Sequence, residues 1–264
     1  MDAEKTVRIG SRTHIGRVRD LNEDSLGTPG TQAIARELQE QRGVLVAVAD
    51  GMGGHTAGEV ASRMAIDVLF KTFYTGSSAD PGRALRYGFE AANQTILALA
   101  ASDSTKAGMG TTLVAAVIRG RTLYVANVGD SRAYLIRDKT TLQITRDHTW
   151  VAEQVRERVI TEEQSRGHAY RNIITRAVGN RTDLQVDLFR QNLKSRDIVV
   201  LCTDGLSKVE TQEIRQIASN ASDPDQAAKE LVDLANERGG EDNVSTIVVW
   251  MLNTPKRWDL NLVH

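Results

Sequence analysis

The chain has 264 residues, of which 41% are hydrophobic and 25% are charged, and its formal net charge is −1. This composition supports a sizeable core and excludes global disorder. The near-neutral charge argues against a protein that mainly coats nucleic acid or an anionic membrane. The single cysteine, Cys202, cannot form an internal disulfide, no apolar run reaches membrane-spanning length, and the N-terminus has no signal-peptide core. We therefore expect a cytoplasmic protein that binds neither nucleic acid nor membrane, and nothing requires more than a monomer.

The first part of the chain predicts a strand over 6–15, a short helix within 32–41 and a strand that ends at Asp50. One helix is expected from Ala57, because apolar residues recur there at helical spacing. A second helix is expected from Pro81 towards Ala101, since proline is favoured in the first turn of a helix.

The pattern changes to period two after residue 112. Short strands over 113–118, 122–128 and 132–137 are separated by turn residues, which predicts an antiparallel meander with Asp130 at a hairpin tip. The later elements comprise helices over 150–159, 211–218 and 224–238, and strands near 186–190, before Asp204 and over 244–251.

Grouped hairpins and paired helices differ from the strict strand–helix alternation of a parallel sheet. We therefore predict an α+β fold, a four-layer αββα sandwich in which two packed antiparallel sheets are flanked by helices. No linker divides the chain, so one domain is expected over 1–253, followed by a C-terminal tail over 254–264.

Two apolar runs rich in β-branched residues end in Asp-Gly, the first at Asp50 and the second at Asp204. An unbroken apolar run predicts a strand buried on both faces, so each carboxylate lies where a rigid strand meets a loop. Two such strands can bring two acids to one point, where they repel each other unless a cation lies between them. This pair of runs is the main reason to predict a metal-dependent enzyme.

Further acids lie at strand ends or in turns that contain Gly or Asn, and they are Glu23, Asp24, Asp130 and Asp242. Carboxylates are hard oxygen ligands that suit Mg²⁺ or Mn²⁺. Taken singly, each acid has an ordinary explanation, because Asp-Gly is a common turn and Asp often caps helices. Arg19, four residues before Glu23, is a candidate phosphate clamp, although a surface arginine is the simpler interpretation of that residue alone.

The sequence lacks the residue patterns that several other catalytic chemistries need. The five histidines show no paired spacing and there is one cysteine, which disfavours a zinc site. No Gly-x-Ser-x-Gly elbow and no Gly-x-x-x-x-Gly-Lys-Ser/Thr phosphate loop is present. His148 and His168 are interpreted as polar loop residues rather than metal ligands.

Seven short motifs, taken together and in order, resemble the metal-dependent protein phosphatases of the PPM family (type 2C), especially its compact bacterial members. The motifs are RDLNED at 19–24, VADGMGGH at 48–55, GMGTT at 108–112, NVGDSR at 127–132, NIITRAVG at 172–179, CTDGLS at 202–207 and EDNVS at 241–245. The resemblance covers roughly residues 7–250 and implies the same sandwich of two sheets.

The resemblance also implies roles at a metal centre. Asp50 would bridge two metal ions, and the carbonyl of Gly51 would bind the first ion. Asp204 and Asp242 would hold the second ion.

Other residues would act around these ions. Glu23 and Asp24 would bind metal-coordinated water or support the metals directly, and Asp130 would join Asp204 in a third metal site. Arg19 would clamp the substrate phosphate, and residues 146–179 would include a mobile flap.

The implied reaction is the hydrolysis of phosphoserine and phosphothreonine in proteins. A water shared by two Mn²⁺ or Mg²⁺ ions, in a site of two to three ions, would attack phosphorus in line. The implied partners are phosphorylated protein substrates, with a Ser/Thr kinase among them by family analogy.

One position departs from some eukaryotic members, which carry a histidine directly after the Asp-Gly pair as the proposed leaving-group acid. Met52 occupies that position here, and His55 is not assigned the role, so the leaving-group acid stays open. A third-metal water is one candidate.

Two other classes of function compete with phosphoprotein hydrolysis. A non-catalytic pseudophosphatase or regulatory binding module would be favoured by the loss of a metal-binding acid, but all of the acids are present. A metal-dependent nuclease would need a basic groove for the nucleic-acid backbone, and the near-neutral charge argues against it.

Overall fold

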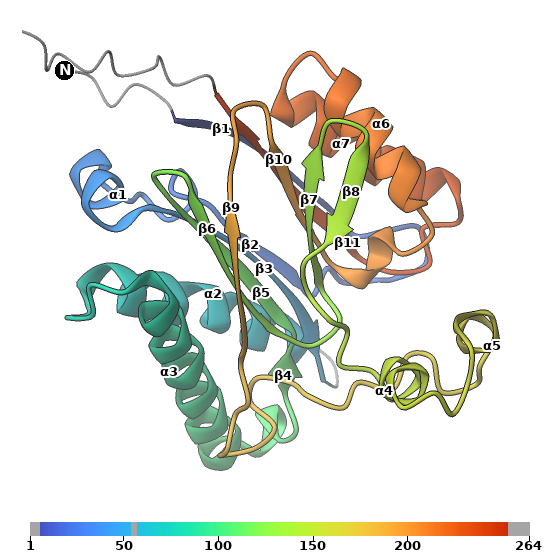
Figure 1. The fold of residues 1–264 in the computed structure, drawn as a ribbon. Helices are drawn as coiled ribbons and strands as arrows, with labels where there is room; N and C mark the ends of the chain where they lie inside the picture. Colours follow the sequence, from blue (N-terminus) through green and yellow to red (C-terminus); the bar gives the residue numbers. More distant parts are fainter. Residues whose placement is uncertain (1–5, 54–56, 253–264) are drawn as a thin grey trace, which may run out of the picture.

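A computed structural model describes residues 6–53 and 57–252. Two antiparallel sheets pack face to face and helices cover their outer faces, which confirms the four-layer sandwich (Figure 1). No helix in the described ranges is long and apolar enough to cross a membrane.

One sheet contains five strands in the order β1-β11-β10-β7-β8, and neighbouring strands are antiparallel. The strands are β1 (Val7–His14), β11 (Val244–Met251), β10 (Ile198–Cys202), β7 (Arg132–Arg137) and β8 (Thr140–Gln143). The helices α6 (Thr211–Asn220) and α7 (Pro224–Glu237) pack on its outer face.

The other sheet has the order β2-β3-β5-β6-β9, and a short strand, β4, pairs with β3 beside this path. The strands are β2 (Asp24–Gly27), β3 (Val44–Met52), β4 (Gly110–Thr111), β5 (Leu113–Arg119), β6 (Thr122–Val128) and β9 (Asp187–Asn192). The helices α2 (Ala57–Thr75) and α3 (Pro81–Ser102) cover its outer face (Figure 1).

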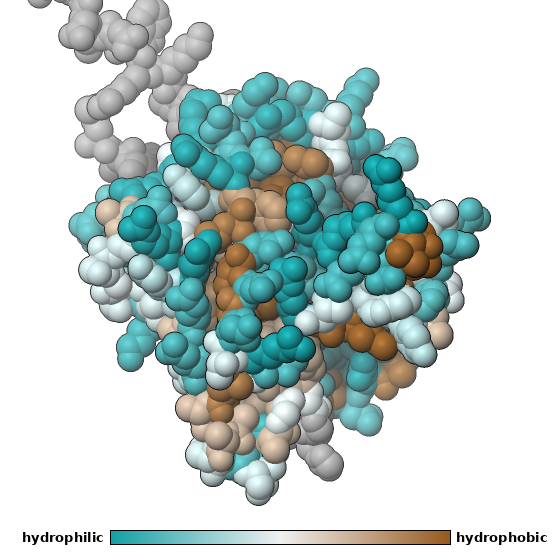
Figure 2. All heavy atoms as spheres, turned by 60° about the horizontal axis from the view of Figure 1, so that its bottom comes forward, coloured by the Kyte–Doolittle hydropathy of each residue, from teal (hydrophilic) through white to brown (hydrophobic). Residues whose placement is uncertain are grey.

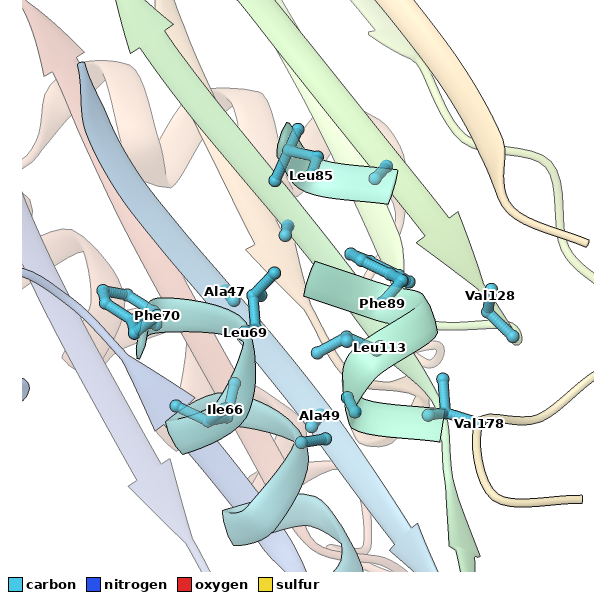
Figure 3. Packing of buried hydrophobic residues seen from close by; sticks show 14 of the residues in the cluster. Ala47, Ala49, Ile66, Leu69, Phe70, Leu85, Phe89, Leu113, Val128 and Val178 are labelled. Carbon is cyan, nitrogen blue, oxygen red and sulfur yellow. The ribbon is translucent and has the colours of Figure 1, made fainter. Parts of the chain in front are cut away.

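The two apolar runs form β3 and β10, one in the interior of each sheet. Because side chains alternate along a strand, Val46 and Val48 of β3 face the space between the sheets, whereas Ala47 and Ala49 face α2 and α3. Figure 3 shows these alanines under Leu69 and its neighbours. The prediction of strands buried on both faces is confirmed, and this packing fixes the end of β3.

The expected start of α3 at Pro81 is confirmed, and the reason is local. The Asp80 side chain accepts a hydrogen bond from the backbone N–H of Arg83 at 2.7 Å, which caps the helix directly before the proline. The start of α2 at Ala57 and the bounds of β11 also agree with the sequence analysis.

The predicted meander is wrong in one step. β5 and β6 form a hairpin, but β7 pairs with β10 and β8 and lies in the opposite sheet. The residues 129–131 therefore carry the chain from one sheet to the other, and Asp130 does not lie at a hairpin tip. Gly129 has a φ of +108°, so the turn needs glycine. The local sequence does not reveal, however, which of the two sheets the strand after this turn will join.

Several short elements were missed or misplaced. The strands β2, β4 and β8 and the helix α5 (Glu162–Arg166) were not expected, and α1 (Arg36–Arg42) covers only the second half of the range predicted for it. The helix α4 (Trp150–Arg156) is shorter than predicted. The tail over 254–264 and His55 lie outside the described residues.

Candidate metal centre

The strands β2 and β3 place two of the predicted acids side by side. Asp24 is the cross-strand partner of Asp50 in the antiparallel pairing, at the point where both strands meet the loops of the site. The backbone of Asp50 is fixed by Thr112, whose side-chain oxygen accepts from the Asp50 N–H at 3.0 Å and whose N–H donates to the Asp50 carbonyl at 2.9 Å. The position of the Asp50 carboxyl therefore follows from strand register.

The other sheet supplies Asp204, which begins a 3₁₀ turn (Asp204–Leu206) after β10. Its carboxyl lies near that of Asp50, since each of the two affects the pKa of the other. The preceding residue, Thr203, donates from its hydroxyl to an Asp24 oxygen at 2.9 Å and accepts from the backbone N–H of Ser245 at 3.0 Å. The ends of the two sheets are therefore joined directly at the acids.

Asp242 enters from the loop before β11, and the next residue, Asn243, fixes this loop to the loop between β1 and β2. The Asn243 amide donates to the carbonyls of Ile15 and Leu21 at 2.8 Å each and accepts from the Glu23 N–H at 2.8 Å. Asn243 thus places Glu23 beside Asp242.

Arg19 lies on the same β1–β2 loop. Its guanidinium forms an ion pair with an Asp242 oxygen at 2.7 Å, and the arginine side chain is 51% exposed. Attraction to Asp50 and Glu23 also raises the pKa of Arg19, after the larger effect of Asp242. One face of the guanidinium is therefore held by the acids while much of it remains open to solvent.

Asp130 reaches the cluster from the crossover between β6 and β7, where its charge is repelled by that of Asp204. The turn is held by His148, which is fully buried. Its Nδ1 accepts from the Gly129 N–H at 3.0 Å, and its backbone N–H donates to the Gly129 carbonyl at 3.1 Å. The ring is neutral, consistent with burial lowering the pKa of His148, and Nε2–H donates to Asp187 at 3.3 Å.

The acids carry oxygens that no protein group satisfies. One carboxylate oxygen on each of four of them is buried without a hydrogen-bond partner, and the four are Glu23, Asp24, Asp130 and Asp204. Unpaired buried carboxylate oxygens are costly, so their concentration at one place indicates a site for a positive ligand. Oxygen-only donors fit Mg²⁺ or Mn²⁺.

The pKa values of these acids agree with that interpretation. Burial, with repulsion from neighbouring carboxylates, raises the pKa of Asp24 and of Asp130 to about 7. The same two causes raise the pKa of Asp50 well above its ordinary value and also raise that of Asp204. Each of these shifts shows that the ionised form lacks compensating positive charge.

Within residues 6–53 and 57–252, no three Asp, Glu, His or Cys side chains are arranged closely enough to hold a metal ion as they stand. Binding a cation here therefore requires side-chain rotations on a backbone that the strands hold in place. Gly51 is part of this backbone, since its N–H donates to the Glu23 carbonyl at 3.1 Å and a Cβ would lie 2.1 Å from the Gly58 carbonyl oxygen.

The structure thus brings together all seven side chains predicted for the site, namely Arg19, Glu23, Asp24, Asp50, Asp130, Asp204 and Asp242. Thr203, Asn243 and His148 were missed as supports. Thr203 and Asn243 could have been found from the sequence, because each is adjacent to a predicted acid. No local pattern marks His148 as buried.

Converging buried acids beside an exposed arginine define a candidate metal-dependent phosphohydrolase site, and the comparisons with known proteins agree. The family model "Protein phosphatase 2C" matches residues 10–244. The serine/threonine phosphatase stp of Listeria welshimeri is 36% identical over 243 residues, which cover 90% of this chain and 93% of that protein. PstP of Mycobacterium tuberculosis is 36% identical over 242 residues, which cover 92% of this chain and 44% of PstP.

Solved structures show the same likeness. A crystal structure of M. tuberculosis PstP has a TM-score of 0.82 at 34% identity and covers 94% of this chain and 99% of that one. The PstP catalytic domain in complex with two manganese ions has a TM-score of 0.80 at 34% identity, with the same coverage. The chain belongs to the protein phosphatase 2C family, which confirms the resemblance found in the sequence.

We predict that the metal-free protein loses stability as the pH rises from about 5 to about 8. The pKa values of Asp24 and Asp130 are about 7 in the folded protein, far above those in an unfolded chain, so the folded state binds more protons across this window. Urea denaturation in EDTA should show a free energy of unfolding that falls with pH, and saturating Mn²⁺ should flatten that fall. A flat or rising profile in EDTA would contradict the assignment of buried, uncompensated acids.

We also predict that His148→Ala lowers the free energy of unfolding by about 2–4 kcal/mol, because the buried Gly129 N–H loses its acceptor and a cavity forms. His148→Asn should recover part of the loss, since its amide oxygen can replace Nδ1. His168→Ala is the comparison, because His168 is only partly buried, against Trp150 and Tyr170, and does not contact Gly129, so it should cost less than His148→Ala. Equal urea midpoints for His148→Ala and His168→Ala would show that the clamp on Gly129 is unimportant.

Proposed function

We propose that this protein hydrolyses phosphoserine and phosphothreonine in proteins with Mn²⁺ or Mg²⁺ at the acid cluster. The observation that carries the proposal is the set of buried, unpaired carboxylate oxygens beside a half-exposed arginine. Membership of the protein phosphatase 2C family and the two manganese ions in the PstP complex support it.

The residues that would hold the ions are those whose oxygens meet at the strand ends. Asp50 would bridge two ions, with the Gly51 carbonyl on the first, and Asp204 and Asp242 would hold the second. The mutual effect of Asp50 and Asp204 on their pKa values supports this pairing, because carboxyls that lie this near each other can share one cation.

The remaining acids would support the centre from its two sides. Glu23 and Asp24 each have one unpaired oxygen, while the other Asp24 oxygen is held by Thr203. Asp130 and Asp204 each have an unpaired oxygen and their charges repel each other, which supports a third ion between these two residues. Two to three ions are therefore proposed.

Bound Mn²⁺ or Mg²⁺ would supply a water of lowered pKa and positive charge for the phosphoryl oxygens. Arg19 would bind the substrate phosphate. A guanidinium has five N–H donors, and the ion pair with Asp242 uses one terminal nitrogen, so donors remain for two phosphate oxygens. Met52 has no proton to donate, so the leaving oxygen must take its proton from another group or from solvent.

The proposal also covers the substrates, a partner, the oligomeric state and the location of the protein. Phosphorylated proteins are the substrates, with a Ser/Thr kinase as a candidate partner, and the protein acts as a cytoplasmic monomer. The single, buried Cys202 supports a reducing compartment. The non-catalytic alternative is not favoured by any observation, because every acid of the predicted set is present at the site.

Asp204→Ala should remove most Mn²⁺ binding and reduce kcat by at least about 10³-fold, because a shared ligand is lost from the centre. The measurement is hydrolysis of a phosphothreonine peptide titrated with Mn²⁺, with calorimetric Mn²⁺ binding as a second readout. Asp233→Ala, which removes a surface ion pair with Lys229, is the control and should behave as wild type. Full activity of Asp204→Ala, or wild-type activity untouched by EDTA, would refute the mechanism.

Arg19→Ala should lower kcat/KM by about 30-fold, equivalent to about 2 kcal/mol, while Mn²⁺ binding persists. This free-energy loss is at the lower end of the range for a charged contact, because the Arg19 side chain is half exposed. Arg12→Ala is the matched control, since Arg12 is an exposed arginine on β1. If both variants have the same kcat/KM, Arg19 is not the phosphate clamp.

A further inference from the structure

A cleft of about 750 Å³ lies beside the metal centre. Its walls are the β7–β8 hairpin, the segment that carries α4 and α5, and the turn that leads from the 3₁₀ turn at Asp204 into α6. In Figure 1, α4 and α5 lie below the layer of α6 and α7. Figure 2, which brings this lower side forward, shows a largely hydrophilic face broken by small apolar patches.

The cleft adjoins the candidate site at two points. Arg132 lines the cleft, lies two residues after Asp130, and lowers the pKa of Asp204 by its positive charge. Ser207 also lines the cleft, and its N–H donates to the Asp204 carbonyl at 2.7 Å. A peptide whose phosphate is at the acids can therefore continue into this cleft.

The cleft contains arginines that the protein does not neutralise. Arg132 is occupied, because it donates twice to Asp147, at 3.1 Å and 2.6 Å. Arg156 makes only long contacts, the closer at 3.5 Å to the Asp147 carbonyl. Arg146 and Arg166 line the same cleft and are exposed, and within the described part of the chain neither guanidinium has a hydrogen-bond or ion-pair partner.

The acids of the lining do not offset these charges. Asp147 is bound by Arg132. The other two, Glu162 and Glu210, lie at the N-terminal ends of α5 and α6, where the local backbone N–H groups favour a carboxylate. The two unpaired guanidiniums therefore face the cleft as free anion-binding groups.

We infer that this cleft recognises acidic groups on the residues that flank the phosphorylated residue of the substrate. Arg146 and Arg166 bind the anion, which is an Asp or Glu carboxylate or a second phosphate, because a guanidinium matches both in a two-point contact. The inference rests on the proposed function, and it names the substrate class as acidic or multiply phosphorylated protein segments.

The test uses phosphothreonine peptides that differ only in the flanking residues, which are Ala, Glu, Lys or phosphoserine. For wild type, kcat/KM should be about tenfold higher for the Glu peptide than for the Ala peptide, and lowest for the Lys peptide. The phosphoserine arm distinguishes a second phosphate from a carboxylate as the preferred anion. Arg146→Ala with Arg166→Ala should reduce the Glu/Ala ratio to about two or less, and Arg166→Glu should shift the preference towards Lys.

The matched control is Arg86→Glu, on the exposed face of α3 in the opposite outer layer. It changes charge equally and should keep the wild-type Glu/Ala ratio. A wild-type ratio near one, or equal ratios in Arg166→Glu and Arg86→Glu, would overturn the cleft assignment.

Equilibrium binding of the labelled peptides in EDTA separates this inference from the proposed function. Tighter binding of Glu peptides that depends on Arg166 supports the cleft even if no peptide is hydrolysed, in which case the proposed function fails. Hydrolysis of every peptide with no difference in binding or kcat/KM overturns the cleft alone.

Discussion

The mutual repulsion of carboxylates that are partly removed from water is the constraint on which the rest of this structure depends. Asp24, Asp50, Asp130 and Asp204 all have raised pKa values because burial and neighbouring negative charge act together. Such a cluster is unfavourable unless rigid elements hold it and a cation compensates it. The four-layer sandwich provides the rigid elements, since β3 and β10 are each packed on both faces.

Protein donors satisfy one side of the cluster and leave the other side free. Thr203 holds one oxygen of Asp24, Asn243 fixes the loop of Glu23, and His148 fixes the turn before Asp130. One carboxylate oxygen on each of these three acids is nevertheless buried without a partner. This one-sided arrangement distinguishes a ligand site from a set of structural caps, in which both oxygens would be used or exposed to water.

Much of this arrangement could be predicted from the sequence, because apolar periodicity and the residues that follow each run are local signals. The two Asp-Gly runs predicted β3 and β10 and the meeting of Asp50 with Asp204. The crossover at Gly129 was mistaken for a hairpin, since a Gly-Asp-Ser turn is compatible with both and the choice of partner strand depends on tertiary packing. The burial of His148 depends on the same long-range packing, and no local pattern reveals it.

The cations should lie where the ends of β3 and β10 converge, and anomalous diffraction can locate them. Crystals grown with Mn²⁺ and measured at the manganese absorption edge should show at least one peak within about 2.5 Å of carboxylate oxygens from both Asp50 and Asp204. The absence of any peak among the acids, or peaks confined to other surfaces of the protein, would contradict the claim that these strands converge to hold metal.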